Sequence, residues 1–295
     1  MANLYAWRCP LTTQVVCANM RRLSSRHQSN QSAREVEKFS SLNWWDARSN
    51  PLVGMNPIRV SFIGDTAAKV MKSPSHKPLN EMRVLDVGAG GGLLTESLSR
   101  LGATLVVGLD ASEHVVQAAR AHSLHSNSKL QSVVEYHGGT TVEQFAIQWK
   151  DKPLFDVVTC LEVIEHVPEP ESLLQAAVSL LKPGGILFVS TINRTLKSYG
   201  MAILAAEYLT GKVPLGTHDW NQFRSPDEVD RMVCGDMTSM APIDRRGMVL
   251  NPPYVNMEWR LCNQDTDVNW IGAWTREKKA HVLQRPERSM SKSRR

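Results

Sequence analysis

The feature that most constrains the fold is a run of glycines, 88–92, placed between a β-rich segment and an amphipathic one. From 82 to 192, short β-rich runs alternate with amphipathic helical stretches, the pattern of a parallel sheet with helices on both faces. Strands are expected at 83–87, 104–109, 133–136, 155–159 and 186–191, with a closing hairpin near 247–250 and 255–261. The sequence therefore predicts an α/β fold with a doubly wound, mostly parallel, seven-stranded sheet.

Turn and cap residues mark where the helices of this pattern begin and end. One helix is expected to follow the glycines and to run to about Leu101, and Ser112 is expected to cap the next, which runs to about Ser123. A third helix, over 171–181, should stop at the Pro183-Gly184 pair.

The ends of the chain differ in charge from its middle. Residues 1–34 contain five arginines and no acidic residue, and residues 276–295 contain eight Lys or Arg and two acidic residues. The middle therefore holds the other 21 basic and 27 acidic residues, so the folded part is acidic although the whole chain carries +5. A nucleic-acid-binding protein would need a basic face on its folded body. The charge distribution argues against nucleic acid as a partner.

These differences divide the chain into a leader, one domain and a tail. Residues 1–34 are rich in Arg and Ser and lack acids, which is typical of a mitochondrial transit peptide, with a disordered basic tail as the alternative. One folded domain is expected over 35–275, followed by a basic disordered tail over 276–295. The five cysteines have no C-x-x-C spacing, which favours free thiols. The sequence contains no run of about twenty apolar residues, so it predicts no membrane-spanning helix.

The glycine run is a predicted cofactor site because it follows a strand and opens a helix. Glycines let the backbone approach a ligand, and the helix N-terminus offers N–H groups to an anion, here the carboxylate of a methionine moiety. Gly88 begins the run, and Asp110 ends the next strand, where its carboxylate can accept hydrogen bonds from both ribose hydroxyls. Asp86 is well placed for the cofactor's amino group.

Two residues argue against the other reading, a dinucleotide-dependent oxidoreductase. The G-x-G-x-x-G fingerprint requires glycine at position 93, which is Leu93, and Asp86 is charged where a dinucleotide-binding strand keeps apolar packing. The strand at 155–158 and the turn at 181–185 also follow the methyltransferase pattern. The sequence favours a class I, Rossmann-like, S-adenosylmethionine-dependent methyltransferase.

Several motifs together resemble the ubiquinone-biosynthesis O-methyltransferases. The likeness extends from about Glu35 to Phe223, and the region 232–246 departs from it. The motifs are Trp44-Trp45-Asp46, Met55-Asn56-Pro57-Ile58-Arg59, Val84-Leu85-Asp86-Val87-Gly88-Ala89-Gly90-Gly91-Gly92, 156–168, Ser190-Thr191-Ile192-Asn193-Arg194 and Gly216-Thr217-His218-Asp219-Trp220. The mitochondrial-type leader fits a eukaryotic member.

The resemblance implies methyl transfer from S-adenosylmethionine to a ring hydroxyl of polyprenylated catechol-type intermediates, at two O-methylation steps of ubiquinone biosynthesis. It implies Arg59, Gly88, Asp110 and Leu161 as cofactor-binding residues, and other ubiquinone-biosynthesis proteins as partners in a multienzyme complex. Two alternatives stay open. One is a noncatalytic, cofactor-binding scaffold of such a complex, and the other is a methyltransferase for another small phenolic substrate.

An acidic cluster follows the fourth predicted strand. Glu162, Glu165 and His166 are spaced i, i+3 and i+4, so they share one side if the chain turns helically there. Two carboxylates and an imidazole suit a hard divalent cation such as Mg²⁺, and the resemblance implies the same role. Alternatively, His166 acts as a general base, or the cluster only shapes the loop. The sequence assigns no catalytic residue.

An apolar insertion follows the fifth predicted strand, over 193–219. Ser198 is expected to cap a short helix that ends near Gly211, flanked by Arg194, Lys197 and Lys212. Such a helix is too short to span a bilayer but suits peripheral contact with anionic headgroups. The prediction is peripheral attachment to the matrix side of the mitochondrial inner membrane. The alternative is packing on the domain or on a partner subunit.

Overall fold

The computed structural model describes residues 43–47, 50–126, 131–200, 219–235, 239–251 and 258–278. The predicted leader at 1–34, most of the insertion and nearly all of the predicted tail lie outside these ranges. Within the described part, no helix is long and apolar enough to cross a membrane.

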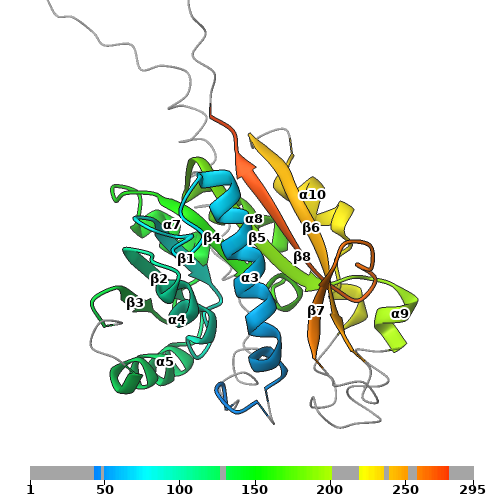
Figure 1. Ribbon diagram of the computed structural model, residues 1–295, viewed down its shortest axis with the longest axis horizontal. Coiled ribbons are helices and arrows are strands. Elements are labelled where there is room, and N and C mark those ends of the chain that lie inside the picture. Colours follow the sequence, from blue (N-terminus) through cyan, green and yellow to red (C-terminus); the bar gives the residue numbers. More distant parts are fainter. Residues whose placement is uncertain are drawn as a thin grey trace, which may run out of the picture.

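A single sheet of eight strands organises these residues, in the order β3-β2-β1-β4-β5-β8-β6-β7 (Figure 1). The first five strands in this order are parallel, and the last three are antiparallel. The strands are β1 (Arg83–Val87), β2 (Leu105–Leu109), β3 (Val134–His137), β4 (Phe155–Leu161), β5 (Leu181–Ile192), β6 (Met240–Leu250), β7 (Trp259–Cys262) and β8 (Asn269–Arg276). The predicted α/β class with a mostly parallel sheet is confirmed, with eight strands where seven were expected.

Helices cover both faces of the sheet. Helices α3 and α4 share one buried apolar cluster, and α7, α8 and α10 share the other. Figure 1 shows α3 lying across the middle of the sheet. The helices and 3-10 turns are α3 (Pro51–Met71), α4 (Leu93–Arg100), α5 (Glu113–Ser126), α7 (Val142–Gln148), η1 (Ile164–His166), α8 (Pro170–Ser179), α9 (Leu196–Ser198), η3 (Trp220–Gln222) and α10 (Pro226–Val233).

The strand order reverses between β1 and β4. From β1 the chain adds β2 and β3 on one side, and it then returns to add β4 and β5 on the other. Ligands in open α/β sheets bind beyond the carboxyl ends of the strands at such a switch point. The residues after Val87 and Leu161 therefore lie where a cofactor is expected.

The predicted parallel strands agree with the structure to within two residues at most of their ends, and the antiparallel half differs more. The predicted hairpin exists as β6 and β7, with Leu250 opposite Trp259. Strand β8 was not predicted, and it crosses the expected boundary between domain and tail at 275. Strand β5 begins at Leu181, before the Pro183-Gly184 pair that was expected to separate helix from strand.

Two local predictions about helix starts have different outcomes. Ser112 accepts a hydrogen bond from the backbone N–H of Val115 at 3.3 Å, which confirms it as a helix cap. The helix after β5, however, is capped by Thr195, and Ser198 is the third helical residue of the same capping box. The helix therefore starts one turn earlier than predicted, because the Thr195 hydroxyl accepts a hydrogen bond from the Ser198 N–H.

Candidate cofactor-binding site

The turn between β1 and α4 is built from glycines with left-handed backbone angles. Gly88, Gly90 and Gly92 have φ values of 74°, 54° and 86°, which favour residues without a Cβ. At Gly88 a Cβ would also lie 2.3 Å from Cγ2 of Val163, which comes from the loop after β4. The sequence thus needs glycine here both for the turn itself and for the close approach of the neighbouring strand's loop.

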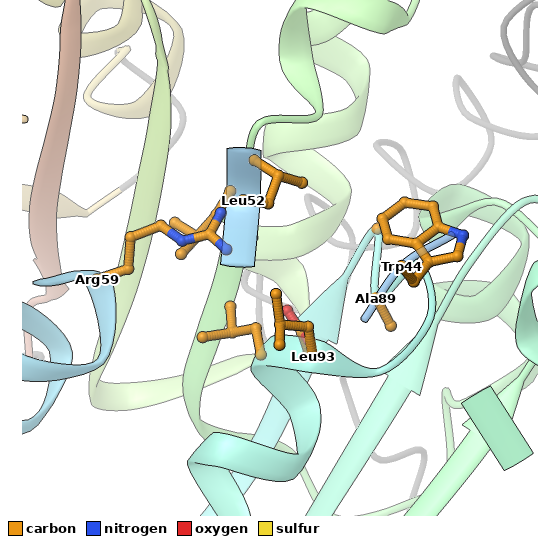
Figure 2. Close-up of a pocket in the computed structure, with 9 residues that line it drawn as sticks. Trp44, Leu52, Arg59, Ala89 and Leu93 are labelled. Atoms are coloured by element: carbon orange, nitrogen blue, oxygen red, sulfur yellow. The ribbon is translucent and has the colours of Figure 1, made fainter. Parts of the chain in front are cut away.

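A small cavity lies beside this turn, at the carboxyl ends of β1 and β4. Three of the four predicted cofactor-binding residues line it, namely Arg59, Gly88 and Leu161. Figure 2 shows Arg59 on one side of the cavity and Trp44 beside Ala89 on the other. The complete lining is Trp44, Leu52, Arg59, Asp86, Gly88, Ala89, Leu93, Leu94 and Leu161. The structure therefore brings together residues as far apart in the sequence as Trp44 and Leu161.

Arg59 reaches the cavity from α3 and is almost fully buried, with 3% of its surface exposed. Its guanidinium donates one hydrogen bond to Oδ1 of Asn56 at 3.4 Å, and its Nε has no hydrogen-bond partner among the described residues. Burial lowers the pKa of Arg59, while the negative charges of Glu162 and Asp86 raise it. A buried cation with unused donors at a cavity is suited to binding an anionic ligand group.

Asp86 is buried at the base of the cavity. Its two carboxylate oxygens accept hydrogen bonds from the hydroxyls of Thr95 and Thr159, at 2.6 and 2.8 Å. Burial raises the pKa of Asp86 to about 6, although these hydrogen bonds and Arg59 oppose the rise. The side chain thus links α4 and β4 to β1, and Asp86 lines the cavity in which the cofactor's amino group is expected.

The raised pKa of Asp86 has a consequence for stability. Between about pH 4 and 6 the folded protein holds a proton at this carboxyl that the unfolded chain has released, so the free energy of unfolding falls as pH rises. The loss is about 3 kcal/mol. The Asp86→Asn variant lacks this titrating group, so its free energy of unfolding should not fall in this way. Between pH 4 and pH 7, its free energy of unfolding should therefore rise by about 3 kcal/mol relative to that of the wild type. Urea unfolding across this range measures the difference, and a pH-independent difference would contradict the assignment.

Asp110, the fourth predicted cofactor residue, does not line the cavity. It follows β2, and its carboxylate accepts hydrogen bonds from the backbone N–H groups of Gly90 and Ser112, at 2.9 and 2.8 Å. Burial raises the pKa of Asp110, and these two hydrogen bonds oppose the rise. Asp110 therefore fixes the position of the glycine turn, and its role toward the ribose remains a prediction.

The acidic cluster does not adopt the predicted helical turn. Only a 3-10 turn, η1, follows β4, and Glu162 before it has a left-handed φ of 56°, which is strained for a residue with a Cβ. Among the described residues, no group of three or more His, Cys, Asp or Glu side chains is placed to hold a metal ion. In the described part of the chain, the three predicted ligands are therefore not arranged as a metal-binding group, and their role toward a cation remains a prediction.

Two hydroxyls of β5 each donate a hydrogen bond to one carboxylate of this cluster. Ser190 donates to Glu162 at 2.6 Å, and Thr191 donates to Glu165 at 2.8 Å. Successive side chains of a strand point to opposite faces, so the two hydroxyls lie on opposite faces of β5. Burial and the charge of Glu162 raise the pKa of Glu165, and His166 Nε2 lies 4.0 Å from its carboxylate.

Sequence reasoning missed several lining residues of the cavity, of which Trp44 is the largest. Trp44 was noted only as part of a motif, yet its indole lies against the glycine turn. The neighbouring Trp45 donates a hydrogen bond to the Gly91 carbonyl at 3.1 Å and stacks on His122 at 3.6 Å between ring centroids. The signal was the pair of adjacent tryptophans ahead of the first helix, but it did not specify what they contact.

Comparison with known proteins identifies the class first. Residues 62–233 match the methyltransferase-domain family, which is more than half of the chain. The N-methyltransferase NodS from Bradyrhizobium japonicum, solved with S-adenosyl-L-homocysteine, has a similar fold, with a TM-score of 0.53 over 83% of this chain and 98% of that one. At 13% identity this likeness concerns the fold alone. The chain is an S-adenosylmethionine-dependent methyltransferase.

Closer relatives define the family within this class. The ubiquinone biosynthesis O-methyltransferase of Dinoroseobacter shibae is 40% identical over 247 residues, covering 81% of this chain and 94% of the relative. The mitochondrial ubiquinone biosynthesis O-methyltransferase of Dictyostelium discoideum is 41% identical over 248 residues, covering 80% and 75%. The chain therefore belongs to the ubiquinone biosynthesis O-methyltransferases, as its motifs predicted.

Proposed function

We propose that this enzyme methylates a ring hydroxyl of polyprenylated catechol-type intermediates, at two O-methylation steps of ubiquinone biosynthesis. The observation that carries the proposal is the buried guanidinium of Arg59 at the cavity beside Gly88, where it suits the carboxylate of S-adenosylmethionine. Methyl transfer is an in-line displacement, so the protein contributes mainly by aligning the acceptor oxygen with the methyl group. Relatives that share the family name at about 40% identity support the substrate class.

The test is transfer of labelled methyl from S-adenosylmethionine to a short-chain prenylated dihydroxybenzoate. A matched acceptor in which both hydroxyls are already methylated should receive no label. Transfer to simple phenols but not to the prenylated acceptor would favour a different small phenolic substrate. Binding of cofactor without transfer to any acceptor would favour the noncatalytic scaffold.

We also propose that Glu162, Glu165 and His166 hold a divalent cation, Mg²⁺ or Mn²⁺, when substrate is bound. The chemistry of the donor set supports this, since two carboxylates and an imidazole are suitable ligands. Glu165 would have to leave Thr191, and Glu162 would have to leave Ser190. A bound cation would lower the pKa of a coordinated ring hydroxyl. Without a cation, His166 is the alternative general base.

We further propose that the protein is mitochondrial and contacts the matrix side of the inner membrane peripherally, together with other ubiquinone-biosynthesis proteins. The mitochondrial relative and the basic composition of residues 1–34 support the compartment. Support for the surface comes from Leu196 and Tyr199, which are 87% and 43% exposed at the start of the insertion. Most of the predicted membrane-contact helix lies outside the described residues.

The charges beside this surface are already paired. Arg194 forms an ion pair with Glu228, and Lys197 contacts Asp265 at 2.8 Å and Asp267 at 3.3 Å. These pairs reduce what Arg194 and Lys197 would contribute to binding anionic headgroups. The apolar side chains therefore have to supply more of the affinity than the sequence suggested.

We expect Leu196→Asp to weaken binding of the full chain to anionic liposomes at least tenfold, because it replaces an apolar anchor worth about 1.5–3 kcal/mol with a negative charge. Liposome flotation measures this. Leu124→Asp is the matched control, since Leu124 is 65% exposed on α5 and should not affect binding. The membrane proposal fails if the wild type does not float with the liposomes, or if Leu196→Asp floats as well as the Leu124→Asp control.

A further inference from the structure

The indole of Trp44 covers the part of the glycine turn that a cofactor would approach. A Cβ built at Gly90 would lie 2.4 Å from ring atom Cζ3 of Trp44, and one built at Gly91 would lie 2.3 Å from the Trp44 Cβ. The aromatic side chain thus rests directly on the backbone of both glycines. A ligand that contacts the same backbone has to take the place of this side chain.

The size of the cavity leads to the same conclusion. Its volume is about 30 Å³, which is room for roughly two water molecules. S-adenosylmethionine consists of an adenosine and a methionine joined through sulfur, and it is far larger than this space. The cofactor therefore cannot lie wholly within this space as the structure has it.

Trp44 is the lining residue best placed to move. The other lining residues belong to α3, β1, the glycine turn, α4 or β4. The glycine turn is fixed to β2, since the backbone N–H groups of Gly88 and Ala89 both donate to the Leu109 carbonyl, at 2.8 and 3.0 Å. Trp44 instead lies in the short segment 43–47 ahead of α3.

The contacts on either side of Trp44 hold its backbone in place. The Asn50 side-chain amide donates to the Trp44 carbonyl at 2.8 Å. On the other side, the Trp45 indole donates a hydrogen bond to the Gly91 carbonyl and stacks on the ring of His122. Rotation of the Trp44 side chain would move the ring off Gly90, while the Trp44 Cβ beside Gly91 stays in place and Trp45 and Asn50 keep the segment near the site.

We propose that Trp44 is a displaceable cover of the cofactor site, whose indole leaves Gly90 when S-adenosylmethionine binds. Trp45 and Asn50 are the anchors that limit this movement to the one side chain. Opening of the cover then limits the rate at which cofactor enters, because the binding-competent arrangement has to form before the complex does. Trp44 is thus a further residue that controls cofactor entry in this enzyme.

The association rate constant of S-adenosylmethionine tests the proposal. We expect Trp44→Ala to raise it at least tenfold and to change the dissociation rate constant less than threefold, measured by surface plasmon resonance on the immobilised full-length protein. Trp220→Ala is the control for general loosening, since Trp220 does not line the cavity, and it should leave both rates unchanged. Circular dichroism checks that each variant is folded.

A second measurement does not depend on truncating the side chain. Trp44→Phe keeps an aromatic ring on the turn but removes the indole. The difference in tryptophan fluorescence between the wild type and this variant is therefore the emission of Trp44. If the cover opens, acrylamide should quench that difference signal more strongly after S-adenosylmethionine is added. The proposal is overturned if quenching is unchanged or weaker, or if Trp44→Ala leaves association unchanged. It is also overturned if dissociation rises tenfold with no change in association, because the indole then packs against bound cofactor.

Discussion

Arg59→Met is expected to weaken S-adenosylmethionine binding at least a hundredfold. The guanidinium is buried beside the cavity, and Asp86 and Glu162 are the negative charges that act on it most strongly. Methionine has a similar length but no charge, so two carboxylates lose their nearest cation, and the cofactor carboxylate loses its partner. Removing one member of a buried charge pair costs about 3–5 kcal/mol. Calorimetric titration of the full chain measures the change in affinity.

Two further variants make this result specific. Arg59→Lys keeps the charge but loses the planar fork of donors, so its affinity should lie between those of the wild type and Arg59→Met. Arg120→Met removes an exposed arginine that pairs with Glu113 on α5, and such surface pairs contribute about 0–1 kcal/mol. If Arg59→Met binds cofactor as the wild type does while remaining folded, the methionine carboxylate binds elsewhere.

Excess chelator is expected to abolish methyl transfer, and Mg²⁺ or Mn²⁺ should restore it. The double variant Glu162→Gln with Glu165→Gln should lose at least a hundredfold in activity, the range over which activation of a nucleophile contributes. Cofactor affinity, measured separately by calorimetry, should be much less affected by chelation. Glu169→Gln with Glu171→Gln is the matched control, because it removes two exposed carboxylates next to the same turn.

Full turnover in excess chelator would contradict the cation proposal. The hydrogen bonds of Glu162 to Ser190 and of Glu165 to Thr191 would then be the native arrangement throughout the reaction. His166 would become the favoured general base. Binding of Mn²⁺ to the full chain, followed by electron paramagnetic resonance, separates a failure to bind metal from a failure to use it.

The parallel half of the fold was predictable from the sequence because its signals are local. Strand β1 was predicted with its observed bounds, since a short apolar run ends at a glycine turn. Helix α3 was not predicted, because Gly54, Pro57 and Gly64 interrupt its pattern and its burial depends on distant partners. Strand β8 was also missed, and its pairing with β5 joins residues about 80 positions apart.

The candidate site was predictable in its residue types but not in its full arrangement. Gly88, Arg59 and Leu161 converge on one cavity as the motifs implied. The spacing of Glu162 and Glu165 predicted a shared side only under α-helical geometry. The left-handed φ of Glu162 interrupts that geometry, and each carboxylate instead accepts a hydrogen bond from a different hydroxyl of β5. Neither effect is encoded in spacing alone.

The packing of α3 against β7 has a consequence for the order in which the site is completed during synthesis. A Cβ at Gly54 would lie 3.6 Å from Cδ1 of Trp259, so the helix that carries Arg59 rests on one of the last strands of the domain. A ribosome adds about 5–20 residues per second, so roughly 10–40 s separate the end of α3 from the arrival of β7. During that time this side of α3 lacks its final neighbour. The cofactor pocket, although its residues come mostly from the first half of the domain, acquires its last support only when the carboxyl-terminal hairpin emerges.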